Sequence, residues 1–187
     1  MDQQIFKHFQ DVIETSMIVG DVFSKPIADA SHKIAAALLD GNTIFSCGEK
    51  SGALVAQLFN DYLAYGFELD RPGFVALNLN KLSDGNFTDN HFAQSLQVHG
   101  KSADVLLVVS AGGNSQALIE AIETAIDKNM TVLLLSAAKD DLLSATVGYN
   151  DVLISTAEFS GQLTTQAQFQ IVQCICVLVD HQIFGGE

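Results

Sequence analysis

The chain has 187 residues, 48% of them hydrophobic, and 22 Asp and Glu against 9 Lys and Arg give a formal net charge of −13. This length suits one domain with a sizeable core and is short for two, so we expect a single domain over residues 1–187. The negative charge repels phosphate backbones and anionic lipid, which disfavours direct binding to nucleic acid or to a membrane surface. Binding to a basic protein partner is compatible with this charge.

The cysteines and the lack of a sorting signal indicate in which cellular compartment the protein is found. Cys47, Cys174 and Cys176 are odd in number, and we interpret them as small buried apolar residues rather than as a disulfide or a metal site. No signal-peptide pattern begins the chain, and no uninterrupted apolar run reaches about 18 residues. We therefore expect a protein of the reducing cytoplasm.

Predicted strands and helices alternate along most of the chain. Two amphipathic helices are predicted first, over residues 3–23 and from Lys25-Pro26 to a stop at 40–42. Short uninterrupted apolar runs, typical of strands buried on both faces, follow at 43–47, 73–77, 104–109, 131–136 and 151–154. Helical patterns occupy 52–65, 89–98, 115–128, 140–146 and 162–184, and a polar loop is expected at 78–88. The order predicts an α/β three-layer sandwich, a five-stranded parallel sheet flanked by helices, with two N-terminal helices.

Two turns follow strands at the edge where such sheets bind ligands. They read CGEKSGA (47–53) and SAGGNSQ (110–116), and each precedes a helix, whose free N–H groups favour an anion. Hydroxyls at Ser51, Ser110 and Ser115 would add neutral donors. The alternative is structural: Ser115 caps its helix and the glycines turn the corner. Two such turns on one edge favour a ligand site.

The segments that contain these turns carry a family resemblance. GNTIFSCGEKSGALVAQLFNDYL and ADVLLVVSAGGNSQALIEAIETAIDKNMTVLLLS resemble the two signatures of sugar isomerase (SIS) domain proteins of the phosphoheptose isomerase group. The resemblance covers nearly the whole chain and implies a flavodoxin-like SIS fold. It also implies a phosphosugar pocket, whose candidate residues here are Lys50, Ser51, Gly52, Ser110, Gly112, Asn114 and Ser115.

The residues that carry out the chemistry of that family are replaced at the corresponding positions of this chain. The family's enzymes isomerise a seven-carbon sugar phosphate at a zinc site, and the resemblance places Leu58, Tyr62, Thr165 and Gln173 at the four ligand positions. Zinc needs imidazole, carboxylate or thiolate donors, so we expect no metal, no other cofactor and no catalytic residue of the parent type. Ala111 and Gly112 replace a threonine and a serine, Asn80 replaces an aspartate, and Lys50 adds a charge.

A non-catalytic branch of the family, the DnaA initiator-associating proteins, forms homotetramers that bind the replication initiator DnaA. The ending QCICVLVDHQIFGGE resembles that branch, whose hydrophobic pair implicated in initiator binding corresponds to Ile183 and Phe184. The resemblance implies an oligomeric adaptor with a possible phosphosugar pocket. The alternatives are a sedoheptulose 7-phosphate isomerase and a phosphosugar-binding sensor.

Apolar faces on the first and last helices exceed what one small sheet covers. The resemblance implies tetramers that bury such faces between subunits, so we expect a homotetramer, or at least a dimer. The residues are Ile5, Phe9, Ile13 and Met17 on the first helix, and Ile171, Val172, Ile175 and Val179 on the last.

Overall fold

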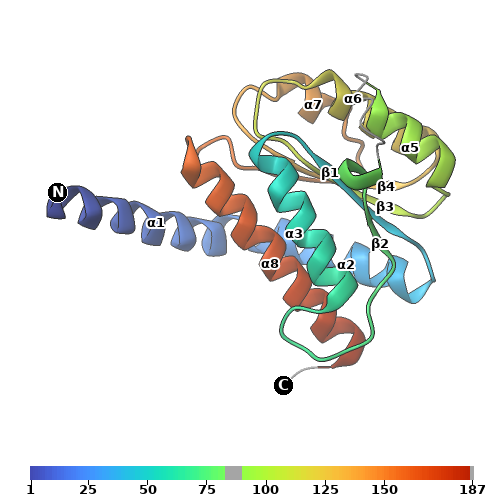
Figure 1. Ribbon diagram of the computed structural model, residues 1–187, viewed down its shortest axis with the longest axis horizontal. Coiled ribbons are helices and arrows are strands. Elements are labelled where there is room, and N and C mark those ends of the chain that lie inside the picture. The colour runs from blue at the N-terminus through green and yellow to red at the C-terminus, as the bar shows by residue number, and fades with distance from the viewer. Residues whose placement is uncertain (83–89, 186–187) are drawn as a thin grey trace.

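The computed structural model describes residues 1–82 and 90–185, which form eight helices and one five-stranded sheet (Figure 1). The strands are β1 (Ile44–Gly48), β2 (Ala76–Asn78), β3 (Val105–Val109), β4 (Thr131–Ser136) and β5 (Val152–Ser155). The helices are α1 (Asp2–Val22), α2 (Ser24–Leu39), α3 (Ser51–Tyr65), α4 (Leu79–Leu82), α5 (His91–His99), α6 (Gln116–Asp127), α7 (Asp141–Thr146) and α8 (Gln162–Phe184). The predicted α/β class and its two N-terminal helices are confirmed.

All five strands run parallel, in the order β2-β1-β3-β4-β5. Ile44 of β1 lies opposite both Ala76 of the edge strand β2 and Val105 of the central strand β3. This order brings the carboxyl ends of β1 and β3 together, so the two predicted turns lie at one edge of the sheet.

Helices cover both faces of the sheet, and each face has its own core (Figure 1). Alternate residues of β3 serve the two cores: Leu107 packs with α2, α3 and α8, whereas Leu106 packs with α5 and α6. Burial on both faces is the reason that β1, β3 and β4 read as uninterrupted apolar runs rather than as an alternating pattern, whereas the edge strand β5 alternates between buried and exposed residues.

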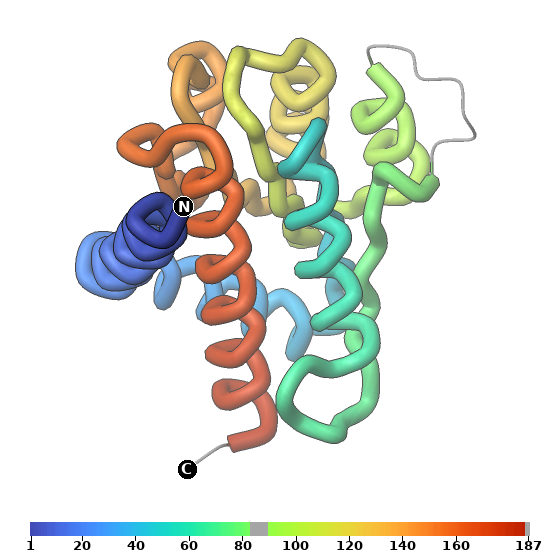
Figure 2. Tube along the Cα trace, turned by 60° about the vertical axis from the view of Figure 1, so that its left-hand side comes forward, coloured from blue at the N-terminus to red at the C-terminus, as the bar shows by residue number. Residues whose placement is uncertain are grey.

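Helix α1 extends away from the rest of the molecule, as Figures 1 and 2 show. Its exposed apolar residues include Ile5, Phe9, Ile13 and Met17, as predicted. The corresponding expectation for α8 is wrong. Its four predicted surface residues, Ile171, Val172, Ile175 and Val179, are completely buried within the chain, because α8 packs against α2, α3 and the sheet. The case for an oligomer therefore rests on α1.

The segment after α3 differs from the prediction. Gly73 and Phe74 do not join the sheet, because the chain first crosses the end of α3, where Phe74 N donates to Leu63 O, whereas Val75 O already accepts from Ile44 N of β1. Gly73 permits this crossing, since a Cβ there would lie 2.0 Å from Ala64 O. Strand β2 therefore begins at Ala76, and the predicted loop opens with the short helix α4. Residues 83–88 of that loop lie outside the described residues.

By length and composition alone, α8 would be able to cross a membrane. Its buried face contributes to the core, however, and its buried polar residues Gln168 and Asp180 bond to other parts of the chain. These contacts identify α8 as a core helix of the sandwich.

Candidate functional site

A cavity of about 310 Å³ lies at the carboxyl edge of the sheet. It is bordered by the beginnings of α3 and α8, by the turn after β3 and by the segments after β4 and β5. Its lining residues are Ser51, Ala111, Ala137, Ala138, Ala157, Glu158, Phe159, Ser160, Gly161, Thr164 and Thr165. Two helix N-termini at one cavity favour a negatively charged ligand group. We call it the edge cavity.

The first turn delivers one predicted residue to this cavity. Ser51 lines it, whereas Lys50 is an exposed N-cap of α3 with φ 52° and ψ −122°, a conformation that glycine favours. The N-cap of α8, Gly161, adopts nearly the same conformation. Gly52 has a packing role, since a Cβ there would lie 2.3 Å from Val109 O. The glycine thus lets α3 start directly against β3.

The second turn is held by bonds within the chain. Gly113 N and Asn114 N donate to Asp140 Oδ1, and Ala137 N donates to the other carboxylate oxygen. Gly112 N donates to Ser110 Oγ over 3.0 Å. The buried Asp140 carboxylate therefore already occupies two of the backbone donors that the sequence offered to a phosphate.

The side chains of the same turn cap helices. Ser115 Oγ accepts from Leu118 N at the start of α6, which confirms the structural interpretation of that serine. Asn114 Oδ1 accepts from Leu142 N and Leu143 N and so caps α7. Of this turn, Ala111 rather than a serine reaches the lining of the edge cavity.

Buried polar side chains lie behind the cavity. Gln168 Nε2 donates to Ser110 O and to Thr156 Oγ1, which ties α8 to the ends of β3 and β5. Gln168 Oε1 and Ser136 Oγ are buried without a hydrogen-bond partner among the described residues. Buried atoms of this kind are ordinarily satisfied by a bound water.

Cys47 follows the same edge but is not a reactive thiol. It is completely buried in β1, and burial, with a smaller contribution from the Glu49 carboxylate, raises the pKa of its thiol. A neutral buried thiol is a poor nucleophile. Cys176 is also buried, as predicted, whereas Cys174 is exposed, so the prediction of three buried cysteines is wrong at that position.

A second hollow, of about 600 Å³, runs along α8 beside the edge cavity. Its lining residues are Gln162, Thr165, Gln166, Phe169, Gln170 and Gln173. Thr165 lines both spaces, so the two are contiguous. Gln166 Oε1 is a buried acceptor without a partner among the described residues. We call this uncharged space the glutamine groove.

Two of the four predicted zinc-ligand positions, Thr165 and Gln173, line this groove. Gln173 Nε2 lies 3.3 Å from Tyr62 Oη, and Leu58 lies one turn before Tyr62 on α3. Leucine, threonine, glutamine and a phenol that already bonds a glutamine do not fit zinc, which requires imidazole, carboxylate or thiolate donors. In the described part of the chain, no group of three or more His, Cys, Asp or Glu side chains is arranged to hold a metal ion.

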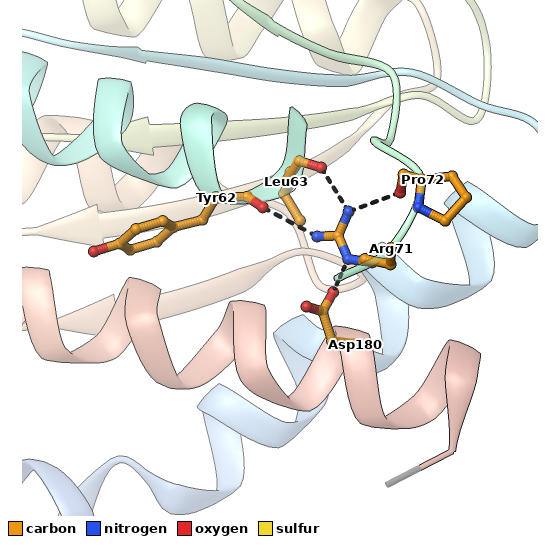
Figure 3. Close-up of polar contacts among 5 residues, drawn as sticks. All are labelled: Tyr62, Leu63, Arg71, Pro72 and Asp180. Atoms are coloured by element: carbon orange, nitrogen blue, oxygen red, sulfur yellow. Dashed lines mark hydrogen bonds and ion pairs between the residues drawn. The ribbon is translucent and has the colours of Figure 1, made fainter. Parts of the chain in front are cut away.

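Arg71 ties the C-terminal end of α8 to the segment after α3 (Figure 3). Its Nε lies 2.7 Å from Asp180 Oδ1, and the other guanidinium nitrogens donate to the carbonyl oxygens of Tyr62, Leu63 and Pro72. The side chains of Arg71 and Asp180 are 2% and 3% exposed. Burial raises the pKa of Asp180, and Arg71 opposes that rise.

The predicted partner-binding pair lies next to this link. Ile183 is half-buried against the core, whereas Phe184 is 44% exposed and stacks on Phe74, with ring centroids 5.8 Å apart. The structure thus presents Phe184, rather than both residues, to solvent.

A parallel sheet covered by helices on both faces, with a cavity at the carboxyl ends of its strands, defines the class of open α/β sandwich domains, which bind ligands at that edge. The chain belongs to the SIS domain family, whose model matches residues 8–137. A phosphoheptose isomerase of Methylibium petroleiphilum is 31% identical, with 100% of this chain and 97% of that protein covered. The DnaA initiator-associating protein DiaA of Shigella flexneri serotype 5b is 28% identical over 100% of this chain and 99% of its own length.

The fold is also that of solved phosphoheptose isomerases. One from Francisella tularensis superposes with a TM-score of 0.86, covering 96% of this chain and 97% of its own, at 24% identity. At that identity the likeness concerns the fold alone.

Sequence reasoning missed Asp140 and Arg71. Arg71 is the one arginine in the chain and precedes Pro72, a signal that was available. Asp140 gave no such signal, since acidic residues are abundant and its bonds to residues 113 and 114 depend on the fold.

Proposed function

We propose that this chain is a non-catalytic SIS-fold adaptor that assembles into a homo-oligomer and binds a DnaA-type replication initiator. The observation that carries the proposal is the uncharged glutamine groove, where Tyr62 and Gln173 bond each other at positions that the resemblance gives to zinc ligands. The full-length likeness to DiaA supports the same role. A cytoplasmic location, without direct binding to DNA or membrane, follows from the proposal and agrees with the charge of −13.

The α1 helix supports assembly. Its exposed stripe of Ile5, Phe9, Ile13 and Met17 lies on a helix that extends from the molecule, as expected of a face that a second copy covers. We propose a homotetramer. Ile13→Asp should shift the species seen by light scattering toward the monomer of 20.0 kDa. A wild-type monomer at micromolar concentration would contradict the proposal.

The two contiguous spaces support a phosphosugar ligand that is bound and not converted. The edge cavity suits a phosphate at Ser51 and the helix N-termini, and the amides of the groove suit hydroxyl groups. In this assignment Lys50 adds charge at the mouth, while Gly52, Ser110, Gly112, Asn114 and Ser115 shape the two turns. Calorimetry with sugar phosphates tests it. Binding lost in Ser51→Ala supports the site, and no binding at millimolar concentration refutes it.

The competing function is a phosphoheptose isomerase, which the 31% identical relative supports. That function requires a general base for an enediol-type proton transfer. The groove lining contains amides, a threonine and a phenylalanine, and Glu158 in the lining of the edge cavity is the one carboxylate among the residues that line the two spaces. Turnover of sedoheptulose 7-phosphate would establish the enzyme and displace the adaptor proposal.

Capture of purified initiator by the immobilised chain tests the adaptor role. Phe184→Ala should weaken capture roughly tenfold, as expected when an aromatic anchor is lost from an interface. The matched control is Tyr149→Ala, which removes a fully exposed aromatic residue elsewhere and should leave capture unchanged. Equal affinities for wild type and Phe184→Ala, or a collapse of the oligomer, would remove Phe184 from the interface.

A further inference from the structure

The edge cavity and the glutamine groove lie along one pair of helices. Helices α3 and α8 run side by side in the same direction, and both begin at the carboxyl edge of the sheet (Figures 1 and 2). Within the described residues, neither N-cap has a side chain that accepts from the first N–H groups of its helix. A phosphate fits this end of the space, where Ser51 lines the cavity.

The amides of the groove offer oxygen atoms to a ligand. Ser16 Oγ donates its hydrogen to the carbonyl oxygen one turn earlier in α1, so in its contact of 2.8 Å with Gln170 the amide Nε2 is the donor. The Nε2 of Gln173 is likewise used in its bond to the phenol of α3. Gln166 Oε1 is buried and meets no donor among the described residues. A ligand of this groove must therefore supply hydrogen-bond donors.

Glu158 adds a negative charge to the lining of the edge cavity. It is exposed on the segment between β5 and α8, and its carboxylate forms no ion pair or hydrogen bond with the described residues. None of the described residues that line the two spaces is a lysine, an arginine or a histidine. This carboxylate repels a phosphate, whereas it attracts a positively charged group on the same ligand.

An ammonium group satisfies both the charge and the hydrogen bonds of this lining. It carries a positive charge and N–H donors, so it pairs with a carboxylate and also bonds amide oxygens. The volumes of about 310 and 600 Å³ lie within the range of about 300–1,000 Å³ that is usual for small-molecule sites. A sugar that carries a phosphate at one end and an ammonium group elsewhere therefore complements the two spaces.

We propose that the edge cavity and the glutamine groove select a sugar phosphate that carries a free ammonium group, and that Glu158 sets this preference. The proposal rests on the phosphosugar pocket proposed above and names the class of ligand for it. A neutral sugar phosphate leaves Glu158 without a partner, and an N-acetylated one has an uncharged amide in place of the ammonium group.

The probes are glucosamine 6-phosphate, glucose 6-phosphate and N-acetylglucosamine 6-phosphate, which share the phosphate and differ in the group on one carbon. In calorimetry, the wild-type chain should bind glucosamine 6-phosphate about tenfold more tightly than the other two, as expected of one charge-assisted contact. Equal affinities for the three ligands overturn the proposal.

Glu158→Gln keeps the size of the side chain and removes its charge. The affinity for glucosamine 6-phosphate should fall about tenfold, whereas the affinity for glucose 6-phosphate should stay or rise, because repulsion of the phosphate is removed. A change in the shape of the cavity would instead weaken all three ligands together, and that result contradicts the proposal.

The matched control is Glu123→Gln, which removes an exposed carboxylate on α6 outside the lining of both spaces. It should change each affinity by less than about twofold. Equal falls in the two variants would overturn the role of Glu158.

Free glucosamine and inorganic phosphate separate this proposal from the phosphosugar pocket. Sugar phosphates that all bind equally, with affinities unchanged in Glu158→Gln, overturn the ammonium preference and leave the pocket intact. Binding of glucosamine that depends on Glu158, together with no binding of inorganic phosphate or of any sugar phosphate, overturns the pocket and leaves only the ammonium contact. No binding of any probe at millimolar concentration overturns both.

Discussion

Replacing Arg71 by methionine tests how the C-terminal end of α8 is held. Methionine keeps much of the side-chain volume but removes the charge and all donors. Asp180 Oδ1 loses its partner at 2.7 Å, and the carbonyl oxygens of Tyr62 and Leu63 lose theirs. The variant thus leaves a buried carboxylate without compensation.

The expected cost is large. Breaking a buried ion pair by removing one partner costs about 3–5 kcal/mol, and both side chains here are almost fully buried. For a chain of this size, each kcal/mol lowers the melting temperature by about 2–4 °C, so we expect a drop of roughly 6–20 °C. The cost is a substantial part of a typical free energy of unfolding of about 5–15 kcal/mol.

The cost should depend on pH. Burial raises the pKa of Asp180 above its ordinary 3.8 even with Arg71 present, and the variant removes the opposing charge. A carboxyl whose folded pKa is raised contributes stability that is fully present below the unfolded pKa and is lost as pH rises through the folded pKa. The gap in stability between wild type and Arg71→Met should therefore be widest at neutral pH and narrow as pH falls toward 4.

Urea unfolding of both proteins at several pH values measures this gap. Adding Asp180→Asn to Arg71→Met should recover part of the loss at neutral pH, because the unpaired charge is gone. A gap below about 1 kcal/mol at neutral pH, or one that widens with acid, would refute the assigned role of the pair.

The backbone at Gly52 and at Lys50 gives two further predictions. Gly52→Ala should lower the free energy of unfolding by more than about 1 kcal/mol, because the new Cβ meets Val109 O. The control is Gly20→Ala, whose Cβ meets no described atom within 4 Å and which should raise the free energy of unfolding by up to about 1 kcal/mol. Equal effects in urea unfolding would contradict the close approach of α3 to β3. Lys50→Gly should relieve the strain of a positive φ and stabilise the fold by about 1 kcal/mol, while Lys50→Ala should not. Calorimetry with inorganic phosphate should show both variants binding more weakly than wild type if Lys50 supplies charge at the edge cavity.

The periodic and apolar patterns were sufficient to predict the fold. Every strand was found, because burial on both faces leaves a run such as VLLVV unmistakable in β3. The first strand residues after α3 were misplaced, because Phe74 bonds the end of α3 and this contact is not local in sequence. The outward face of α8 was also misjudged, since its pattern is apolar on more than one side.

The site was only partly predictable. The resemblance placed Tyr62 and Gln173 at one site, and the fold brings them into contact. The turn after β3 looked like an anion site because its composition is small and polar, yet Asp140, 26 residues from Asn114, occupies its donors. The stacking of Phe74 on Phe184 joins residues 110 positions apart and has no signature in the sequence.

The central claim is that an SIS fold without a zinc site serves as an adaptor. The most direct test is one preparation, supplied with zinc, that is assayed both for conversion of sedoheptulose 7-phosphate and for affinity to the purified initiator of its own cell. The account predicts no conversion above the rate without protein, and an initiator dissociation constant of about 1 μM or tighter, which corresponds to about −8 kcal/mol. Zinc-dependent conversion together with no measurable initiator binding would contradict it.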